Sequence, residues 1–346
     1  MISISKEDVI ATIKKLDPKP EKILLQLPDG LLGNPLQEII EILLSNNIEP
    51  VISGDPSYGA CDLPLYQAEN TGIEYIFHFG HSTFAFPVPS SFKYRVFYFP
   101  IEIPIKIDWH QLISHIKALN WSKIAFLTTI QHISALKEQL QANHVSLKNA
   151  EIFVYHSNDG QILGCNQFIA QQVSHLIDGF VVVAGGDFHA KPIVIATNKP
   201  TLRYDPFNGD IKYFNSEFRN SFFAQRYALI SKAKKAQHWG VILSNKTGQL
   251  KKSLSENICN FIRLKGYQAT LFITDRIDPS HLINFTSIDA WVVTFCPRIA
   301  TDDYVSFNKP VLTTREVKVA LDLISWDDYV NPKINEHFLY LESPEE

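Results

Sequence analysis

The chain has 346 residues, of which 45% are hydrophobic and 20% charged, and its formal net charge at pH 7 is -4. These values are ordinary for a globular protein of two or three domains, and the slight negative charge argues against a non-specific nucleic-acid binder, which is usually basic. The apolar runs, such as residues 180–184, are far shorter than the roughly 20 residues that span a bilayer. No apolar signal core opens the chain, and we therefore expect a cytoplasmic protein with no membrane partner.

The N-terminal third alternates short apolar runs with stretches of helical spacing. A helix is predicted over residues 5–16, with Ser5 as its cap, a second over residues 34–44, and a helical turn over residues 65–70. The predicted strands cover residues 22–27, 50–53, 74–79 and 94–99. The order strand, helix, strand is typical of a parallel sheet.

The same pattern starts again twice. The second stretch predicts strands at 123–127, 151–155, 180–184 and 200–204, with helices at 133–140 and 168–177. The third predicts strands at 239–243, 269–273, 290–295 and 310–312, with helices at 250–265 and, as the last one, 315–323. We therefore expect an α/β fold of three similar small domains, each a mainly parallel sheet flanked by helices, around a central site. The expected domains are residues 1–110, 111–225 and 226–346.

Three of the four cysteines lie in loops that contain Gly or Pro. Cys61 lies in the loop G-D-P-S-Y-G-A-C-D-L, which follows a predicted strand, Cys165 lies in L-G-C-N, and Cys296 follows a predicted strand directly in C-P-R. Cys259 lies within a predicted helix beside apolar residues and is expected to be a small buried hydrophobe. Because each loop cysteine falls in a different predicted domain, we expect them to share one centre.

Three thiolates permit several kinds of site. They are one ligand short of a closed tetrahedral zinc site or a fully ligated four-iron cluster, so a catalytic cluster with an open iron is possible. A zinc site with an open position and a cysteine nucleophile beside a histidine remain alternatives. The absence of a C-x-x-C pair argues against a zinc ribbon.

Five segments carry a resemblance to a known family. They are Q-L-P-D-G-L at 26–31, the Cys61 loop at 54–63, H-F-G-H-S at 78–82, L-G-C-N at 163–166 and F-C-P-R-I-A-T-D-D at 295–303. Together they resemble the archaeal diphthamide synthases, radical enzymes of the first step of diphthamide biosynthesis. The resemblance covers nearly the whole chain, and a single chain with all three cysteines resembles the archaeal, homodimeric type.

This resemblance implies an activity and its cofactors. Cys61, Cys165 and Cys296 match the three ligands of a [4Fe-4S] cluster whose open iron binds S-adenosylmethionine. The family transfers the 3-amino-3-carboxypropyl group of S-adenosylmethionine, as a radical, to C2 of a histidine in translation elongation factor 2. The chain is thus expected to be a transferase that needs an electron donor, with no direct nucleic-acid partner and no catalytic side chain beyond the cluster.

Further residues are expected to contact S-adenosylmethionine. Asp29 and Asp187 are candidates for the sulfonium or the ribose, and Arg298 for the carboxylate, because a guanidinium binds carboxylates bidentately. The candidates for close backbone approach and for lining the pocket are Gly30, Gly80, Gly186 and His81. Each also has a plain structural explanation in a loop or a core.

Two other functions compete with this one. The first is a non-redox, three-domain α/β protein that binds a small molecule in a central cleft and whose cysteines are incidental. The second is a zinc-dependent hydrolase. A basic, aromatic stretch at 222–235 could contact a partner, although a helix with a solvated face explains it as well.

Overall fold

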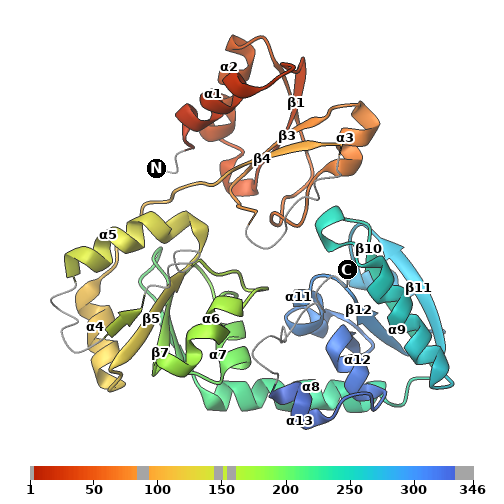
Figure 1. Cartoon of the computed structure of the whole chain (residues 1–346). Helices are drawn as coiled ribbons and strands as arrows, with labels where there is room; N and C mark the ends of the chain where they lie inside the picture. The colour runs from red at the N-terminus through yellow and green to blue at the C-terminus, as the bar shows by residue number, and fades with distance from the viewer. Residues whose placement is uncertain (1–3, 84–92, 144–150, 154–160, 332–346) are drawn as a thin grey trace. The chain divides into compact units, whose positions relative to one another are not determined.

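Three largely parallel sheets flanked by helices form this protein in the computed structural model (Figure 1). The structure describes residues 4–83, 93–143, 151–153 and 161–331. The chain divides into two compact units, one of residues 1–106, 130–141 and 246–248, the other of the remaining residues. The expected α/β fold with three helix-flanked sheets is confirmed, whereas the domain bounds 1–110, 111–225 and 226–346 stay a prediction.

The first unit contains a four-stranded parallel sheet in the order β2-β1-β3-β4. Its strands are β1 (Lys22–Gln26), β2 (Glu49–Ile52), β3 (Tyr75–Phe79) and β4 (Arg95–Phe99). Its helices are α1 (Lys6–Lys15), η1 (Asp29–Leu31), α2 (Asn34–Ser45), α3 (Leu65–Thr71), η2 (Ile130–His132) and most of α5 (Ile133–Asn143). As predicted, Ser5 caps α1 by accepting a hydrogen bond from the Asp8 N–H at 3.2 Å.

Successive side chains of β1 point to opposite faces of this sheet. Ile23 and Leu25 join the cluster that includes residues of α1 and α2, whereas Leu24 joins the cluster that includes residues of α3. This two-residue period is what a strand imposes, and burial on both faces explains why β1 reads as a continuous apolar run.

The second unit contains the two other sheets. The middle sheet has the order β6-β5-β7-β8-β9 and the C-terminal sheet the order β11-β10-β12-β13. The middle sheet is formed by β5 (Lys123–Thr128), β6 (Glu151–Phe153), β7 (Gly179–Val183), β8 (Thr201–Tyr204) and β9 (Ile211–Phe214), and the C-terminal sheet by β10 (His238–Ser244), β11 (Gln268–Thr274), β12 (Ala290–Val293) and β13 (Val311–Thr313). All pairs are parallel except β8 with β9, which is antiparallel.

Helices accompany both of these sheets. Those before and beside the middle sheet are α4 (Trp109–Ala118), α6 (Phe168–Val173), η4 (Ser174–Leu176) and α7 (Lys191–Thr197). The others are α8 (Ser216–Ala233), α9 (Lys252–Leu264), α10 (Pro279–Leu282), α11 (Arg298–Thr301), η6 (Tyr304–Ser306), α12 (Thr314–Ala320) and α13 (Trp326–Val330). The short η5 (Thr247–Gln249) begins in the first unit, which includes residues 246–248. In the described part of the chain, no helix combines the length and the apolar character that crossing a bilayer requires.

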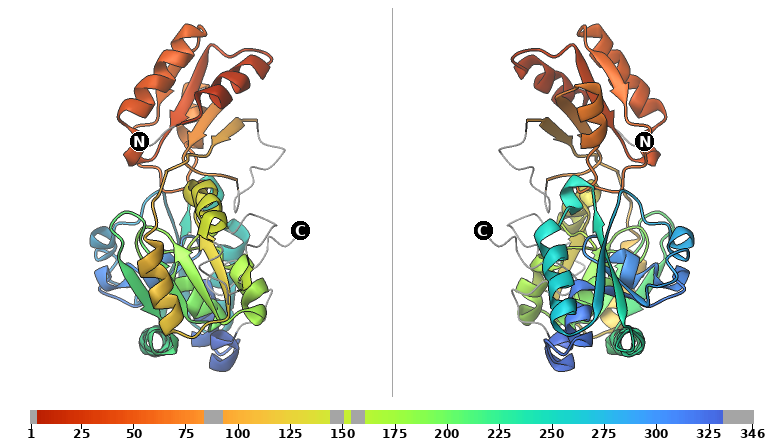
Figure 2. Two further views of the ribbon diagram at one scale, coloured as in Figure 1. Left: turned by 90° about the vertical axis from the view of Figure 1, so that its left-hand side faces the viewer. Right: turned by 90° about the vertical axis from the view of Figure 1, so that its right-hand side faces the viewer.

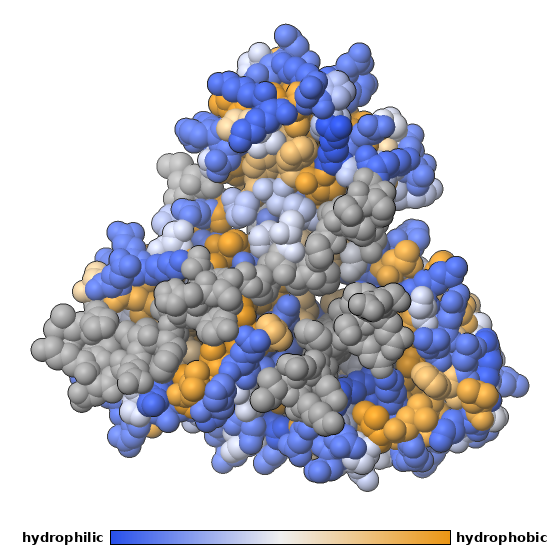
Figure 3. Space-filling view, viewed as in Figure 1, coloured by the Kyte–Doolittle hydropathy of each residue, from blue (hydrophilic) through white to orange (hydrophobic). Residues whose placement is uncertain are grey.

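The prediction that the helix over 315–323 is the last one is wrong. That helix, α12, ends at Ala320, and the chain turns through Asp322, which has a φ of 55°. Ser325 then starts α13 with a capping box in which its hydroxyl and the Asp328 carboxylate each accept a backbone N–H. On the face of the molecule shown in Figure 3, most of the coloured surface is hydrophilic, with hydrophobic areas between.

Helix α8 runs from the middle sheet to the C-terminal sheet (Figure 1), is seen along its axis in Figure 2, and is bonded to helices that accompany each sheet. Arg219 of α8 donates to the carbonyl oxygen of Ile195 in α7 at 3.1 Å and to that of Val330 in α13 at 2.6 Å. About two helical turns further on, Arg226 donates two hydrogen bonds to the carboxylate of Glu316 in α12, each 2.6 Å long. These bonds place the two sheets of the second unit relative to each other.

The Arg226–Glu316 pair is wholly buried and is held by further hydrogen bonds to both partners. The exposed fractions of the two side chains are 1% and 0%. Arg226 also donates to backbone carbonyl oxygens of Ala300 and Val311, and the Tyr329 hydroxyl donates to Glu316 at 2.7 Å. Burial works against ionisation of Glu316, but the Arg226 cation and its hydrogen bonds hold the Glu316 pKa below its usual value.

Replacing Arg226 by Met is expected to destabilise the second unit by about 3–5 kcal/mol, because it leaves the Glu316 carboxylate buried without its cation. Urea-induced unfolding measures the change. Lys234→Met is the matched control, since its pair with Asp322 is exposed and is worth roughly 1 kcal/mol or less. Equal losses in the two variants would contradict the structural role given to Arg226.

Candidate functional site

The three loop cysteines are half-buried and the fourth is not accessible. Cys61 lies in the loop between β2 and α3, Cys165 in the loop between β6 and α6, and Cys296 between β12 and α11. Cys259 is 2% exposed in α9, and burial raises the pKa of its thiol. Its predicted role as a small buried hydrophobe is therefore confirmed, because an apolar site suppresses the reactive thiolate.

Cys61 belongs to the first unit, whereas Cys165 and Cys296 belong to the second. Within the described residues, no three His, Cys, Asp or Glu side chains are gathered closely enough to hold a metal ion. The shared three-cysteine site therefore stays a prediction.

In the part of the chain that the structure describes, several polar atoms in or close to the Cys61 loop have no hydrogen-bond partner. The Tyr98 hydroxyl is one of them, and burial together with the nearby Cys61 raises the pKa of Tyr98 to about 12. Ser53 Oγ and Asp62 Oδ2 are likewise buried and without hydrogen-bond partners. A buried donor such as the Tyr98 hydroxyl needs an acceptor, so the surroundings of this thiol fit a bound group that carries sulfur acceptors.

Residues 246–248 pack against this loop and belong to the same unit. The Lys246 ammonium lies 2.6 Å from Asp62 Oδ1 and 5.2 Å from the centre of the Tyr58 ring. A Cβ on Gly248 would lie 2.6 Å from the Cys61 Cα. Glycine at position 248 thus lets one backbone approach the other closely.

The other predicted residues of the first unit lie at the ends of β1 and β3. Asp29 and Gly30 form the exposed turn η1, and nothing around Gly30 requires a glycine there. Gly80 has a φ of +88°, and a Cβ on it would lie 2.9 Å from Pro28 Cγ. His81 Nδ1 lies 2.9 Å from His78 Nε2, and His78 Nδ1 lies 2.7 Å from Gln26 Oε1.

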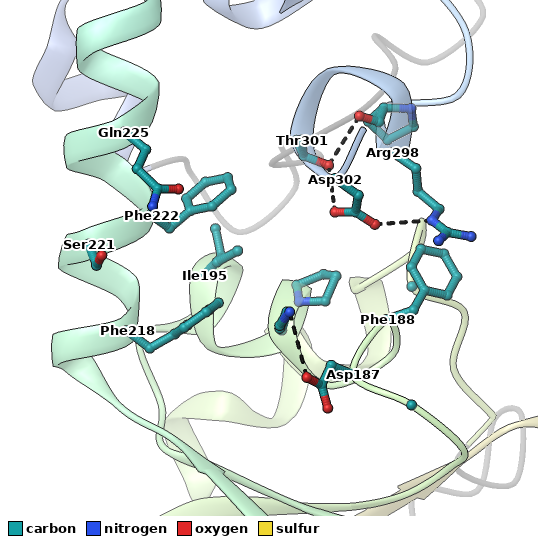
Figure 4. Close-up of a pocket in the computed structure, with 15 residues that line it drawn as sticks. Asp187, Phe188, Ile195, Phe218, Ser221, Phe222, Gln225, Arg298, Thr301 and Asp302 are labelled. Atoms are coloured by element: carbon teal, nitrogen blue, oxygen red, sulfur yellow. Dashed lines mark hydrogen bonds and ion pairs between the residues drawn. The ribbon is translucent and has the colours of Figure 1, made fainter. Parts of the chain in front are cut away.

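A cavity of about 510 Å³ opens in the second unit between the middle sheet's loops, α8 and α11 (Figure 4). Gly186, Asp187 and Arg298, all predicted site residues, line it together. Gly164 and Pro297 also line it, and they are the immediate neighbours of Cys165 and Cys296. The structure therefore brings three of the seven predicted ligand contacts to one cavity beside two of the cysteine loops.

Phe188 contacts residues on two sides of this cavity. The sequence did not single it out. The Arg298 guanidinium lies 4.3 Å from the centre of the Phe188 ring, over its face. On the other side, a Cβ on Gly164 would lie 2.5 Å from the Phe188 carbonyl oxygen. Figure 4 shows Phe188 beneath Arg298, whose guanidinium also pairs with Asp302 at 3.0 Å. Its only sequence signal is its place in the strand-end turn G-G-D-F.

Cations already surround Asp187. Its carboxylate lies 3.1 Å from Arg203 and 3.2 and 3.6 Å from Lys212 and Lys191. Arg203 is 2% exposed and also pairs with Asp210 and with Asp205. Asp187 is thus part of an ion-pair network that sets the Gly186 turn.

Gly186 has a φ of +70°, a left-handed conformation that favours glycine. The Gly186 N–H donates to Asp205 Oδ2 at 3.1 Å, so the carboxylate that pairs with Arg203 also holds the turn. Asp205, which directly follows β8, therefore holds the loop that contains Asp187 and Phe188 in place.

The comparisons with known proteins agree with this picture. The sequence matches the family described as "Putative diphthamide synthesis protein" over residues 27–330. It is 32% identical to the 2-(3-amino-3-carboxypropyl)histidine synthase of Pyrococcus horikoshii, covering 92% of this chain and 91% of that protein. With the protein of the same name from Methanocaldococcus jannaschii it shares 28% identity over 93% of this chain and 90% of the relative.

A solved structure matches the whole chain. The crystal structure of Dph2 from Pyrococcus horikoshii with a 4Fe-4S cluster has a TM-score of 0.80 and 28% sequence identity, and the match covers 100% of this chain and 97% of that one. Fold and relatives together define a transferase built from three α/β sheets. The chain belongs to the diphthamide synthesis family, as its sequence motifs indicate.

Replacing Gly164 by Ala is expected to destabilise the second unit by about 1–3 kcal/mol, because the new Cβ overlaps the Phe188 carbonyl oxygen and ring. Thermal unfolding measures the loss. Gly30→Ala is the control, since a Cβ there meets nothing within 4 Å and should change stability by less than about 0.5 kcal/mol. A tolerated Gly164→Ala would show that the Cys165 loop does not pack on Phe188 as described.

Proposed function

We propose that this protein transfers the 3-amino-3-carboxypropyl group of S-adenosylmethionine to C2 of a histidine in translation elongation factor 2, the first step of diphthamide biosynthesis. The observation that carries the proposal is the match over 92% of the chain to a 2-(3-amino-3-carboxypropyl)histidine synthase. The cysteine-bearing loops and the cavity beside two of them support it.

Cys61, Cys165 and Cys296 are proposed to hold a [4Fe-4S] cluster through three thiolates. The related Dph2 structure, which contains a 4Fe-4S cluster, supports this, as do the half-buried thiols. When bound and reduced, such a cluster would supply the electron that breaks the bond between the sulfonium sulfur and the γ-carbon, which releases methylthioadenosine and the 3-amino-3-carboxypropyl radical. The protein's own residues then bind and orient the substrate and keep water from the carbon radical.

The cavity in the second unit is proposed as the place where S-adenosylmethionine binds. Arg298 pairs with the substrate carboxylate in exchange for Asp302, since both offer the same two oxygens to a guanidinium. The Gly186 turn offers backbone close to the nucleoside. Because Asp187 already has three cations around it, we assign it to the ribose hydroxyls rather than to the sulfonium.

The remaining contacts and partners follow from the family. Asp29, Gly30, Gly80 and His81 are proposed as further contacts of the substrate. The protein is proposed to act in the cytoplasm as a homodimer, with elongation factor 2 as its protein substrate and a separate electron donor. Neither a membrane nor a nucleic acid is needed for this reaction.

A non-redox protein that binds a small molecule is the second candidate. The observation in its favour is the cavity of about 510 Å³ that residues of the second unit form by themselves. It shares the cavity with the first proposal but needs no iron, so metal content separates the two.

Replacing any one of Cys61, Cys165 and Cys296 by Ala is expected to lower cluster iron per chain after anaerobic reconstitution and to reduce transfer at least about 100-fold, since each thiolate is one of only three ligands. Transfer is measured with labelled S-adenosylmethionine, a reductant and elongation factor 2. Cys259→Ala should keep iron and activity, because Cys259 is buried in α9.

The wild-type protein decides between the candidates in the same experiment. A colourless protein after reconstitution with iron and sulfide would favour the non-redox function. Stoichiometric zinc without iron would favour the hydrolase.

Arg298→Met is expected to weaken binding of S-adenosylhomocysteine about 10- to 100-fold, the range for a lost hydrogen-bonded charge pair. It should leave binding of methylthioadenosine unchanged, because that compound has no carboxylate. Titration calorimetry measures both. Arg276→Met, a change at an exposed arginine of the same unit, is the control, and an equal effect of the two variants would remove Arg298 from the site.

A further inference from the structure

Three polar side chains form a chain of hydrogen bonds at the ends of β1 and β3 in the first unit. Gln26 Nε2 lies 2.6 Å from the carbonyl oxygen of Asp62, the residue after Cys61. Gln26 Oε1 lies 2.7 Å from His78 Nδ1, and His78 Nε2 lies 2.9 Å from His81 Nδ1. Gln26 is 2% exposed and His78 is fully buried, so water does not compete for these bonds.

The direction of every hydrogen bond follows from the first one. A backbone carbonyl can only accept, so the Gln26 amide NH2 faces Asp62 and the Gln26 oxygen faces His78. That oxygen can only accept, so His78 Nδ1 carries a proton. A second proton would put a positive charge on a fully buried ring, which burial opposes. His78 Nε2 is therefore a lone pair, and His81 Nδ1 donates to it.

This order determines what His81 offers at its other nitrogen. With the proton on Nδ1, a neutral His81 has an acceptor lone pair on Nε2, which makes no hydrogen bond to any residue in the described part of the chain. Burial lowers the pKa of both rings, that of His78 to about 3, although the Asp62 charge partly opposes the shift for His81. His81 is thus a partly buried ring whose neutral form offers an acceptor.

The surroundings of His81 select a cationic partner. Asp62 acts electrostatically on His81. Its Oδ2 is buried and has no hydrogen-bond partner among the described residues, while Oδ1 pairs with Lys246. Two acceptors, one of them charged, complement a positively charged N–H donor. In S-adenosylmethionine, the carboxylate and the sulfonium have no donor hydrogen, and the hydroxyls and the adenine amino group have no charge, which leaves the ammonium.

We propose that His81 Nε2 accepts a hydrogen bond from the ammonium of the substrate's aminocarboxypropyl group, and that Gln26 and His78 are positioning residues that fix the His81 tautomer. This assignment rests on the proposed function. It makes the amino group a feature that the first unit recognises, beside Cys61.

Nitrogen-15 NMR of the full-length, histidine-labelled protein tests the hydrogen-bond order without any ligand. His78 and His81 should both be neutral with the proton on Nδ1. In Gln26→Leu, the His78 Nδ1–H loses the oxygen that accepts its hydrogen bond. The proton of His81 should then move from Nδ1 to Nε2. Gln131→Leu is the matched control, because Gln131 donates to the neighbouring Gly80 carbonyl at 2.8 Å but is outside the chain of bonds. A proton on Nε2 of His81 in the wild type would overturn the inference.

Binding of two nucleosides tests the ammonium assignment. S-adenosylhomocysteine should bind the cluster-loaded wild type about tenfold more tightly than 5′-(3-carboxypropyl)thioadenosine, which has hydrogen in place of the amino group. The preference should vanish in His81→Phe and Gln26→Leu and persist in Gln131→Leu, with folding checked by thermal unfolding. A wild type without the preference overturns the assignment. If the wild type binds neither nucleoside, the proposed function fails as well. The nitrogen-15 spectrum still tests the direction of the hydrogen bonds independently.

Discussion

Parallel strands end at the same edge of a sheet, and this constraint places every candidate site residue of the chain. In open α/β sheets that edge is where ligands bind. The pairs are parallel throughout except β8 with β9 in the described residues. The segments that follow strand ends are Asp29–Gly30 after β1, Cys61 after β2, Gly80–His81 after β3, Cys165 after β6, Gly186–Asp187 after β7 and Cys296–Arg298 after β12. The candidate site residues therefore lie at the carboxyl ends of the strands of each sheet.

Buried charge holds those edges in place. Arg203, at the end of β8, gathers the carboxylates of Asp187, Asp205 and Asp210 behind the Gly186 turn. Arg226, in α8, bonds to the C-terminal sheet's helix α12 through Glu316. Removing one member of such a pair leaves a charge without compensation in a low-dielectric interior, which is far more destabilising than losing a surface pair. The rigidity of the cavity in the second unit depends on these two arginines.

The fold was largely readable from the sequence because its strands are buried on both faces and form continuous apolar runs. Two of the elements that were not predicted have a local sequence that conflicts with their structure. Helix α7 contains I-V-I-A-T, residues that favour strands, and β9 is an antiparallel edge strand with exposed side chains. The site loops were predictable from Gly and Cys after strands. Phe188 was not predicted. Gln26 and His78 begin two of the motifs, at 26–31 and 78–82, but the sequence does not show that the two side chains bond to each other across neighbouring strands.

Two kinds of buried polar network can nevertheless be told apart once contacts are known. The Arg226, Glu316 and Tyr329 network is closed, since the partners identified for it are core side chains and backbone carbonyls, and it needs no ligand. The Gln26–His78–His81 chain is open, since it ends on a ring nitrogen with no hydrogen-bond partner among the described residues. Apolar side chains at positions 26 and 78 would fill the sheet without the desolvation that buried polar groups cost. An open, fully oriented chain of this kind is therefore better explained by the group it presents than by the stability it adds.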